Sequence, residues 1–253
     1  MADLKDETTV DNTEVNETTE ETVEETPKAI DPSLEGIQLF YETNKKMINY
    51  VGGGLLLIIG AICFFKLYYL PEKENEASNE IFWAQNYFEA DSFNIALKGG
   101  VTVMSPDGQK TIMGFEAIAD EYSMTKTGSL ANYCAGICYL RTGKFEQAIE
   151  FLQKYSGDDE MIAPIAVGAI GDCHMELNHA DEAIKFYLKA AEKSDNSFTT
   201  PFYLKKAGFA YEQKSNFSEA LALYERIQKE YSKSNEGKEI ERDIAKVKAL
   251  GNL

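Results

Sequence analysis

The sequence predicts an all-α protein in which an α-solenoid follows a single transmembrane helix and a disordered acidic leader. Two observations lead to this fold class. Met47–Phe65 is a run of 19 residues without a charged side chain, which is the length that a helix needs to cross the roughly 30 Å core of a bilayer. After it, a pattern of glycine, alanine and aromatic residues recurs three times at spacings of 35 and 37 residues, as expected for stacked helix pairs.

The N-terminal leader, residues 1–36, is strongly acidic. The chain of 253 residues carries a formal net charge of −17, and the leader holds twelve Asp and Glu residues against Lys5 and Lys28. Low hydrophobicity and like charges cannot offset the entropy cost of ordering, so we expect the leader to be disordered. It is interpreted either as an acidic docking tail or as a solvated extension. An acidic chain without a basic stripe repels phosphates, which excludes nucleic acid as a partner.

Residues 37–46 are expected to form a juxtamembrane segment, and residues 47–70 an uncleaved signal anchor. Lys45, Lys46 and Lys66 bracket the apolar run, and tyrosines lie near both of its ends, where interfacial aromatic residues are common. The run is too long for a cleaved signal peptide, and the residues after it are too bulky for a cleavage site. The basic residues near the two ends are equal in number, so charge alone leaves the orientation open.

Gly53 and Gly60 are seven residues apart in this run and therefore lie on one helix face. Small residues on one face let a second membrane helix pack closely. We therefore predict that this face packs against another membrane helix, although no strict GxxxG motif is present.

Three copies of one residue pattern follow the apolar run. The copies contain Gly136, Tyr139, Phe145 and Ala148; Gly171, His174, Ala183 and Phe186; and Gly208, Tyr211, Phe217 and Ala220. Each glycine is expected where a first helix (helix A) approaches its partner (helix B), and each alanine is expected on helix B at the same contact. This pattern resembles the tetratricopeptide repeat (TPR), a helix–turn–helix unit of 34 residues. The resemblance implies a right-handed α-solenoid.

The expected TPR domain covers residues 75–236. It comprises a degenerate repeat at 75–122 and three further repeats at 129–156, 164–192 and 201–231. Residues 98–114 interrupt the degenerate repeat with glycine and proline turn signals. They are interpreted as a flexible loop or as a partner-binding element. Residues 237–253 are expected to form a capping helix and the C-terminus, with Ile240, Ile244 and Val247 on its apolar face.

No motif for catalysis, a cofactor or a metal is recognisable, so we expect a protein that is not an enzyme. Cys134, Cys138 and Cys173 lie in apolar helical runs and are expected to be buried, with a Cys138–Cys173 disulfide as the alternative. His174 lies on the apolar side of a helix and is interpreted as a hydrogen-bonded core residue.

The repeat resemblance also implies a concave groove lined by the A helices. Apolar and aromatic residues at about half of the groove positions favour an apolar helix or extended segment as the ligand. The residues that we expect to form this protein-binding groove are Leu130, Tyr133, Ile137, Leu140, Met175, Phe202, Lys205 and Phe209, with Arg141, Ile165, Gly168, Asp172, Glu176, Glu212 and Gln213 at further groove positions. The alternative is that segments of the chain itself fill the groove.

The whole layout resembles the YfgM-like family of bacterial inner-membrane proteins, in a version typical of Bacteroidota. The most specific stretches are Phe82–Phe93, Gly136–Ala148, Ala169–Asp172 and Phe198–Tyr211. The resemblance implies a single-pass protein with a cytoplasmic N-terminus and a periplasmic TPR domain. It also implies an ancillary role at the SecYEG translocon, beside a PpiD-type periplasmic chaperone, in assisting nascent secreted proteins. The open alternatives are a TPR adaptor for envelope assembly or cell division, and an organelle import receptor that faces the cytosol.

Overall fold

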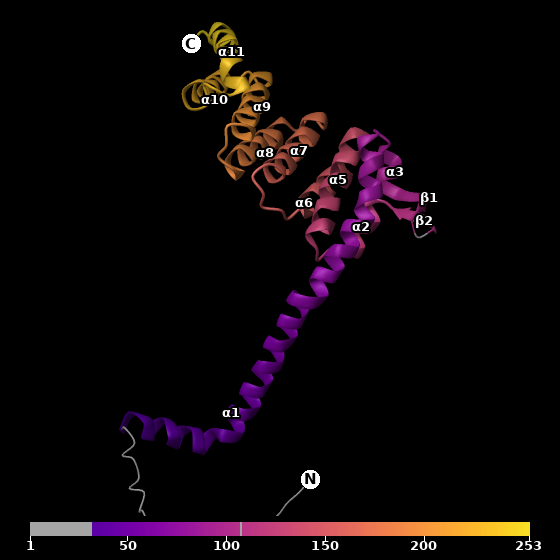
Figure 1. Ribbon diagram of the computed structural model, residues 1–253. Helices are drawn as coiled ribbons and strands as arrows, with labels where there is room; N and C mark the ends of the chain where they lie inside the picture. Colours follow the sequence, from indigo (N-terminus) through magenta and orange to yellow (C-terminus); the bar gives the residue numbers. More distant parts are fainter. Residues whose placement is uncertain (1–31, 107) are drawn as a thin grey trace, which may run out of the picture. The chain divides into compact units, whose positions relative to one another are not determined.

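The protein is described by a computed structural model that covers residues 32–106 and 108–253 (Figure 1). The chain divides after Ile58 into two compact units. The elements in chain order are α1 (Pro32–Phe64), the π-helix η1 (Phe65–Tyr69), α2 (Leu70–Glu89), α3 (Phe93–Lys98), β1 (Gly99–Ser105), β2 (Gly108–Met113), α4 (Phe115–Glu121), α5 (Lys126–Arg141), α6 (Phe145–Lys154), α7 (Ile162–Glu176), α8 (Ala180–Lys193), α9 (Thr199–Gln213), α10 (Phe217–Glu230) and α11 (Asn235–Gly251).

The first unit contains most of helix α1. The continuous helical stretch Gly36–Glu89 includes an 18-residue window of mean hydropathy 2.1 in which no residue is buried. The helix is therefore long and apolar enough to cross a membrane. Helix α1 begins at Pro32, because proline suits the first turn of a helix. The expectation that the leader is disordered up to residue 36 is thus wrong for residues 32–36, and residues 1–31 lie outside the described part of the chain.

The π-helix η1 lets the helical stretch continue past Pro71. The amide of Leu70 donates a hydrogen bond to the carbonyl of Phe65, five residues earlier. Proline lacks an N–H and its ring crowds the carbonyl four residues before it, so it normally breaks or kinks a helix. A wider local turn accommodates the ring. As a result, α2 follows the apolar stretch without a linker.

The second unit is a stack of helix pairs capped by α11. Helix α2 pairs with α3, α5 with α6, α7 with α8, and α9 with α10. The three glycines of the sequence pattern lie at the contacts between helices A and B. A Cβ atom at Gly136, Gly171 or Gly208 would come within 3.0 Å of a side-chain carbon of Leu152, Tyr187 or Tyr224, respectively. The three repeat alanines, Ala148, Ala183 and Ala220, are completely buried. These contacts confirm the close A–B approach that the sequence pattern predicts.

Helix α11 lies where the sequence predicts a capping helix. Helix α11 buries Ile240, Ile244 and Val247 against the last repeat. The side chain of Ser234 accepts a hydrogen bond from the Gly237 amide at 2.9 Å, which satisfies one of the free N–H groups at the start of the helix.

Strands β1 and β2 pair as an antiparallel β-hairpin, so the interpretation of residues 98–114 as a flexible loop is wrong. Gly99 has φ = +67°, and a Cβ atom there would come within 3.0 Å of the Gly114 backbone, so only glycine fits where the hairpin begins. Ile112 is buried, and the ammonium of Lys110 pairs with Glu80 of α2 at 2.7 Å. These contacts hold the hairpin against α2.

Glu74 ties helix α2 to helix α5. Its carboxylate accepts hydrogen bonds from the amides of Lys126 at 2.7 Å and of Thr127 at 3.0 Å. The hydroxyl of Thr127 bonds to the same carboxylate and to Ser78. Helix N-termini leave their first amides without partners, and a carboxylate from a neighbouring helix both satisfies them and matches the helix dipole.

All four cysteines are free thiols, so the alternative of a Cys138–Cys173 disulfide is wrong. Cys134, Cys138 and Cys173 are buried in the helix stack, and burial raises the pKa of each thiol to about 12. These thiols are therefore protonated at neutral pH and react slowly.

The glycine contact between helices A and B generates a stability prediction. Gly171→Ala places a methyl group against the Tyr187 ring, and we expect the repacking to lower the free energy of unfolding by about 1–3 kcal/mol. Urea denaturation of the full chain in detergent measures this loss. Gly36→Ala is the matched control, because a Cβ atom there meets nothing within 4 Å. An unchanged midpoint for Gly171→Ala would contradict the role assigned to the contact.

Candidate protein-binding groove

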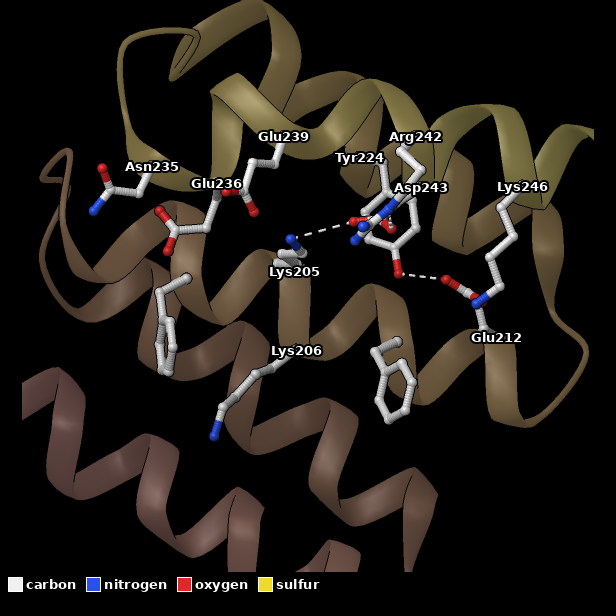
Figure 2. A pocket seen from close by; sticks show the side chains of 12 residues that line it. Lys205, Lys206, Glu212, Tyr224, Asn235, Glu236, Glu239, Arg242, Asp243 and Lys246 are labelled. Atoms are coloured by element: carbon white, nitrogen blue, oxygen red, sulfur yellow. Dashed lines mark hydrogen bonds and ion pairs between the residues drawn. The ribbon is translucent and has the colours of Figure 1, made fainter.

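Two adjoining hollows lie on the A-helix side of the C-terminal repeats. The first has a volume of about 580 Å³ and is lined mainly by α9 and α11 (Figure 2). The second has a volume of about 480 Å³ and is lined by the starts of α7, α9 and α11. They share Phe202, Asn235 and Glu236. We refer to both hollows together as the α9 groove.

Four large apolar side chains line the α9 groove while remaining exposed. Met161, Phe198, Phe202 and Phe209 expose 43, 71, 41 and 51% of their surface, respectively. Phe202 and Phe209 are seven residues apart and therefore share one face of α9, whereas the opposite face buries Leu204 and Ala207 in the core. Clustered exposed apolar residues are typical of binding sites.

Met161 and Phe198 occupy equivalent places in consecutive repeats, immediately before their A helices. The side chain of Asp159 accepts hydrogen bonds from the amides of Met161 and Ile162. In the next repeat, the side-chain oxygen of Asn196 accepts hydrogen bonds from the amides of Phe198 at 2.8 Å and of Thr199 at 2.7 Å. These Asp and Asn turns fix the backbone at the helix starts, which holds the two apolar side chains at the edge of the α9 groove.

The cations of the α9 groove are largely neutralised by acidic residues of the solenoid. Lys205 of α9 pairs with Asp243 of α11 at 3.2 Å, and Lys246 of α11 pairs with Glu212 of α9 at 2.5 Å (Figure 2). Lys206 pairs with Asp172 of α7 at 2.7 Å. Because these ion pairs join successive A helices, they fix the spacing between the helices that line the groove.

Two of these ion pairs are each joined to a B helix by a tyrosine. The hydroxyl of Tyr187 donates to Asp172 at 2.6 Å, and the hydroxyl of Tyr224 donates to Glu212 at 2.7 Å. Burial raises the pKa of both phenols, and the neighbouring carboxylates raise it further. Each phenol therefore stays a neutral donor, and each network links an A helix, its B helix and the next A helix.

The structure brings together only part of the set of groove residues predicted from the sequence. Phe202, Lys205, Phe209 and Glu212 line the first hollow, and Ile165 lines the second. Five others are half-buried in packing: Leu130, Tyr133, Ile137 and Leu140 against the N-terminal core, and Met175 against the C-terminal core. Asp172 pairs with Lys206, and the exposed residues Arg141, Glu176 and Gln213 line neither hollow. Gly168 is buried, because a Cβ atom there would strike the Tyr203 ring. A partner-binding role for any of these residues remains a prediction.

Sequence reasoning missed Met161, Phe198 and the residues of α11 that line the groove. The sequence does carry a signal for the first two. Met161 lies two residues after Asp159, Phe198 lies two residues after Asn196, and the two pairs are 37 residues apart. Helix α11 was interpreted only as a cap, although its Glu236, Glu239 and Asp243 form one wall of the groove.

His174 is a half-buried titratable group with an unsatisfied ring nitrogen. Its ring stacks on Phe186 with the centroids 5.3 Å apart, and the buried Nδ1 atom has no hydrogen-bond partner among the described residues. The expectation of a fully hydrogen-bonded core histidine is therefore wrong at this atom. Burial lowers the pKa of His174 below its ordinary value of 6.5, and the nearby His179 lowers it further, against a smaller opposite effect of Glu182. In the described residues, no group of three or more His, Cys, Asp or Glu side chains is placed to hold a metal ion.

Comparison with known proteins detects the repeats. Two family models of the tetratricopeptide repeat match residues 166–192 and 204–234, which correspond to the second and third sequence repeats. The chain is also similar to two solved structures from Podosopora anserina, described as nearly identical TPR-like repeats of a putative kinesin light chain. One of them, a single-residue variant, is 11% identical to this chain, and the other structure is 10% identical. Each similarity covers 73% of this chain and 87% of the solved chain, with a TM-score of 0.46. No curated protein sequence matches the chain. The family models show that residues 166–192 and 204–234 are TPR repeats, a type of repeat that typically forms scaffolds for protein–protein interaction.

His174 generates a pH prediction. The unfolded chain binds a proton near pH 6.5, whereas the folded chain binds it only at lower pH, so acidification through that window favours unfolding. We expect the melting temperature to fall between pH 7.5 and 5.5, and His174→Phe to reduce this fall. His179→Asn leaves His174 buried, so this variant should retain most of the fall in melting temperature. An identical pH profile for the wild type and His174→Phe would contradict the assignment.

Proposed function

We propose that the chain is a membrane-anchored, non-enzymatic scaffold that binds an apolar segment of a partner protein in the α9 groove. The observation that carries this proposal is the set of four exposed apolar side chains, Met161, Phe198, Phe202 and Phe209, in two adjoining hollows. Water-exposed aromatic residues in a concave site are the usual anchors of protein interfaces. The apolar helix α1 serves as the anchor in this proposal.

Anchoring makes weak binding effective. A partner in the same membrane meets the groove at a local concentration far above its average concentration, so that a modest affinity suffices. The direct passage of the apolar stretch into α2 supports this role, because no long linker dilutes the effect.

The specific partners that we propose are the SecYEG translocon and a PpiD-type chaperone, with nascent secreted proteins as possible clients. This part rests on the resemblance of the layout to the YfgM-like family, and it places the anchor in a bacterial inner membrane with the repeats in the periplasm. Adaptors for envelope assembly and organelle import receptors are the competing assignments. Protease accessibility of the repeats in intact cells distinguishes periplasmic from cytosolic exposure.

Phe209→Asp tests the groove. It puts a charge into the apolar wall of an exposed site, so we expect partner capture to fall about tenfold or more while the helical circular dichroism signal stays unchanged. The measurement is affinity purification of the full chain in mild detergent followed by quantitative mass spectrometry.

Phe82→Asp is the matched control, because Phe82 is also exposed, at 54%, but does not line the α9 groove. Translocon subunits and a periplasmic chaperone lost with Phe209→Asp but retained with Phe82→Asp are the expected result. Equal capture by both variants would overturn the groove assignment, and divisome or peptidoglycan enzymes in place of the translocon would overturn the partner assignment.

A further inference from the structure

We propose that the loop before helix α5 makes a second contact with the membrane, through Met124 and Lys126. The proposal rests on the anchoring described above, and it commits to the phospholipid surface around the anchor as the binding partner. It follows from where α5 begins, from how the loop is held and from which side chains the loop exposes.

Contacts with α2 place the loop at the end of the unit nearest the apolar stretch. Thr127 contacts Ser78 and Glu74, the amide of Lys126 contacts Glu74, and the Tyr122 ring lies 5.9 Å from the ammonium of Lys73. The chain before α5 therefore descends along α2 toward Tyr69. At a rise of 1.5 Å per residue, Lys73 is only about 6 Å along the helix from Tyr69.

An interfacial layer lies within that distance. Phe65 and Tyr69 stack with ring centroids 5.3 Å apart, and Phe64 and Tyr68 stack at 5.8 Å. Aromatic residues at the end of an apolar helix concentrate at the level of the lipid headgroups. Because the headgroup layer extends about 5–8 Å beyond the hydrocarbon core on each side, the loop lies at its outer edge.

The loop is rigid at both ends and exposed at its tip. The hydroxyl of Thr125 donates to the Tyr122 carbonyl at 2.7 Å and accepts from the Gly128 amide at 2.8 Å. Tyr122 and Thr125 are buried. Between them, Met124 exposes 71% of its surface, although neither hollow of the α9 groove includes it.

The exposed chemistry fits a lipid surface. Met124 is a flexible apolar side chain that can enter the boundary between headgroups and acyl chains. The ammonium of Lys126 has no ion-pair or hydrogen-bond partner among the described residues, and it is two residues away, where it can reach a lipid phosphate. Together with the Glu74 contacts, this second attachment fixes the orientation of the solenoid, and hence of the α9 groove, relative to the membrane.

The test measures the membrane depth of single labels in the full chain. Met124→Cys is made in a Cys63→Ser background and labelled with an NBD fluorophore. The three buried thiols, with their pKa of about 12, stay unlabelled. The protein is reconstituted in vesicles of phosphatidylcholine and phosphatidylglycerol, and quenching by lipid-borne 5-doxyl groups is compared with quenching by aqueous iodide.

Met104→Cys is the matched control, since Met104 is equally exposed, at 72%, but lies in the β-hairpin. We expect NBD at position 124 to be quenched by the doxyl lipid and to show an iodide quenching constant roughly fivefold smaller than NBD at position 104. Lys126→Glu should weaken the doxyl quenching. Equal iodide quenching at positions 124 and 104 would overturn the proposal.

A label in the apolar stretch separates this proposal from the anchoring on which it rests. NBD on Leu57→Cys must be quenched by 12-doxyl lipid if the helix crosses the bilayer. If position 57 is quenched and position 124 is not, the loop contact alone is refuted. If position 57 is not quenched, the anchor and the loop contact fail together.

Discussion

The close approach of each A helix to its B helix is the constraint on which the rest of the solenoid depends. It requires glycine on helix A, because Leu152, Tyr187 and Tyr224 of the B helices occupy the space where a side chain would start. Close-packed interiors have no spare volume for a methyl group at such a point. The large side chain on helix B and the glycine on helix A therefore together set the distance between the two helices of each repeat.

Stacking of the repeats depends on a second set of contacts. Tyr187 and Tyr224 face the repeat glycines, and their hydroxyls reach the carboxylates of Asp172 and Glu212, which pair with Lys206 and Lys246 of the next A helix. One tyrosine thus serves packing within a repeat and polar contact between repeats. These polar groups bind one another, whereas the apolar side chains of Phe202 and Phe209 of α9 remain exposed on this surface.

The sequence was sufficient to predict the parts of the fold that repeat. Gly136, Gly171 and Gly208 could be aligned because the same steric requirement acts three times. The β-hairpin occurs once, and its glycine and proline signals are shared with irregular loops, while its position depends on the contact of Lys110 with Glu80 of α2, which is distant in sequence. The groove was predicted only in part for a related reason. Transfer of positions by offset found Phe202 and Phe209, but it could not show that the predicted α5 residues are half-buried against the N-terminal core or that α11 supplies a wall of the α9 groove.

The most direct test of the account is site-specific photo-cross-linking in native membranes. A benzoyl-phenylalanine placed at position 202 reports which protein touches the α9 groove while the chain remains anchored, and one at position 82 reports the surface of α2. The account predicts that the probe at position 202 cross-links to one discrete partner protein and that the probe at position 82 does not cross-link to that protein. The same cross-links from both positions, or none from position 202, would contradict the claim that the exposed face of α9 is where this scaffold binds its partner.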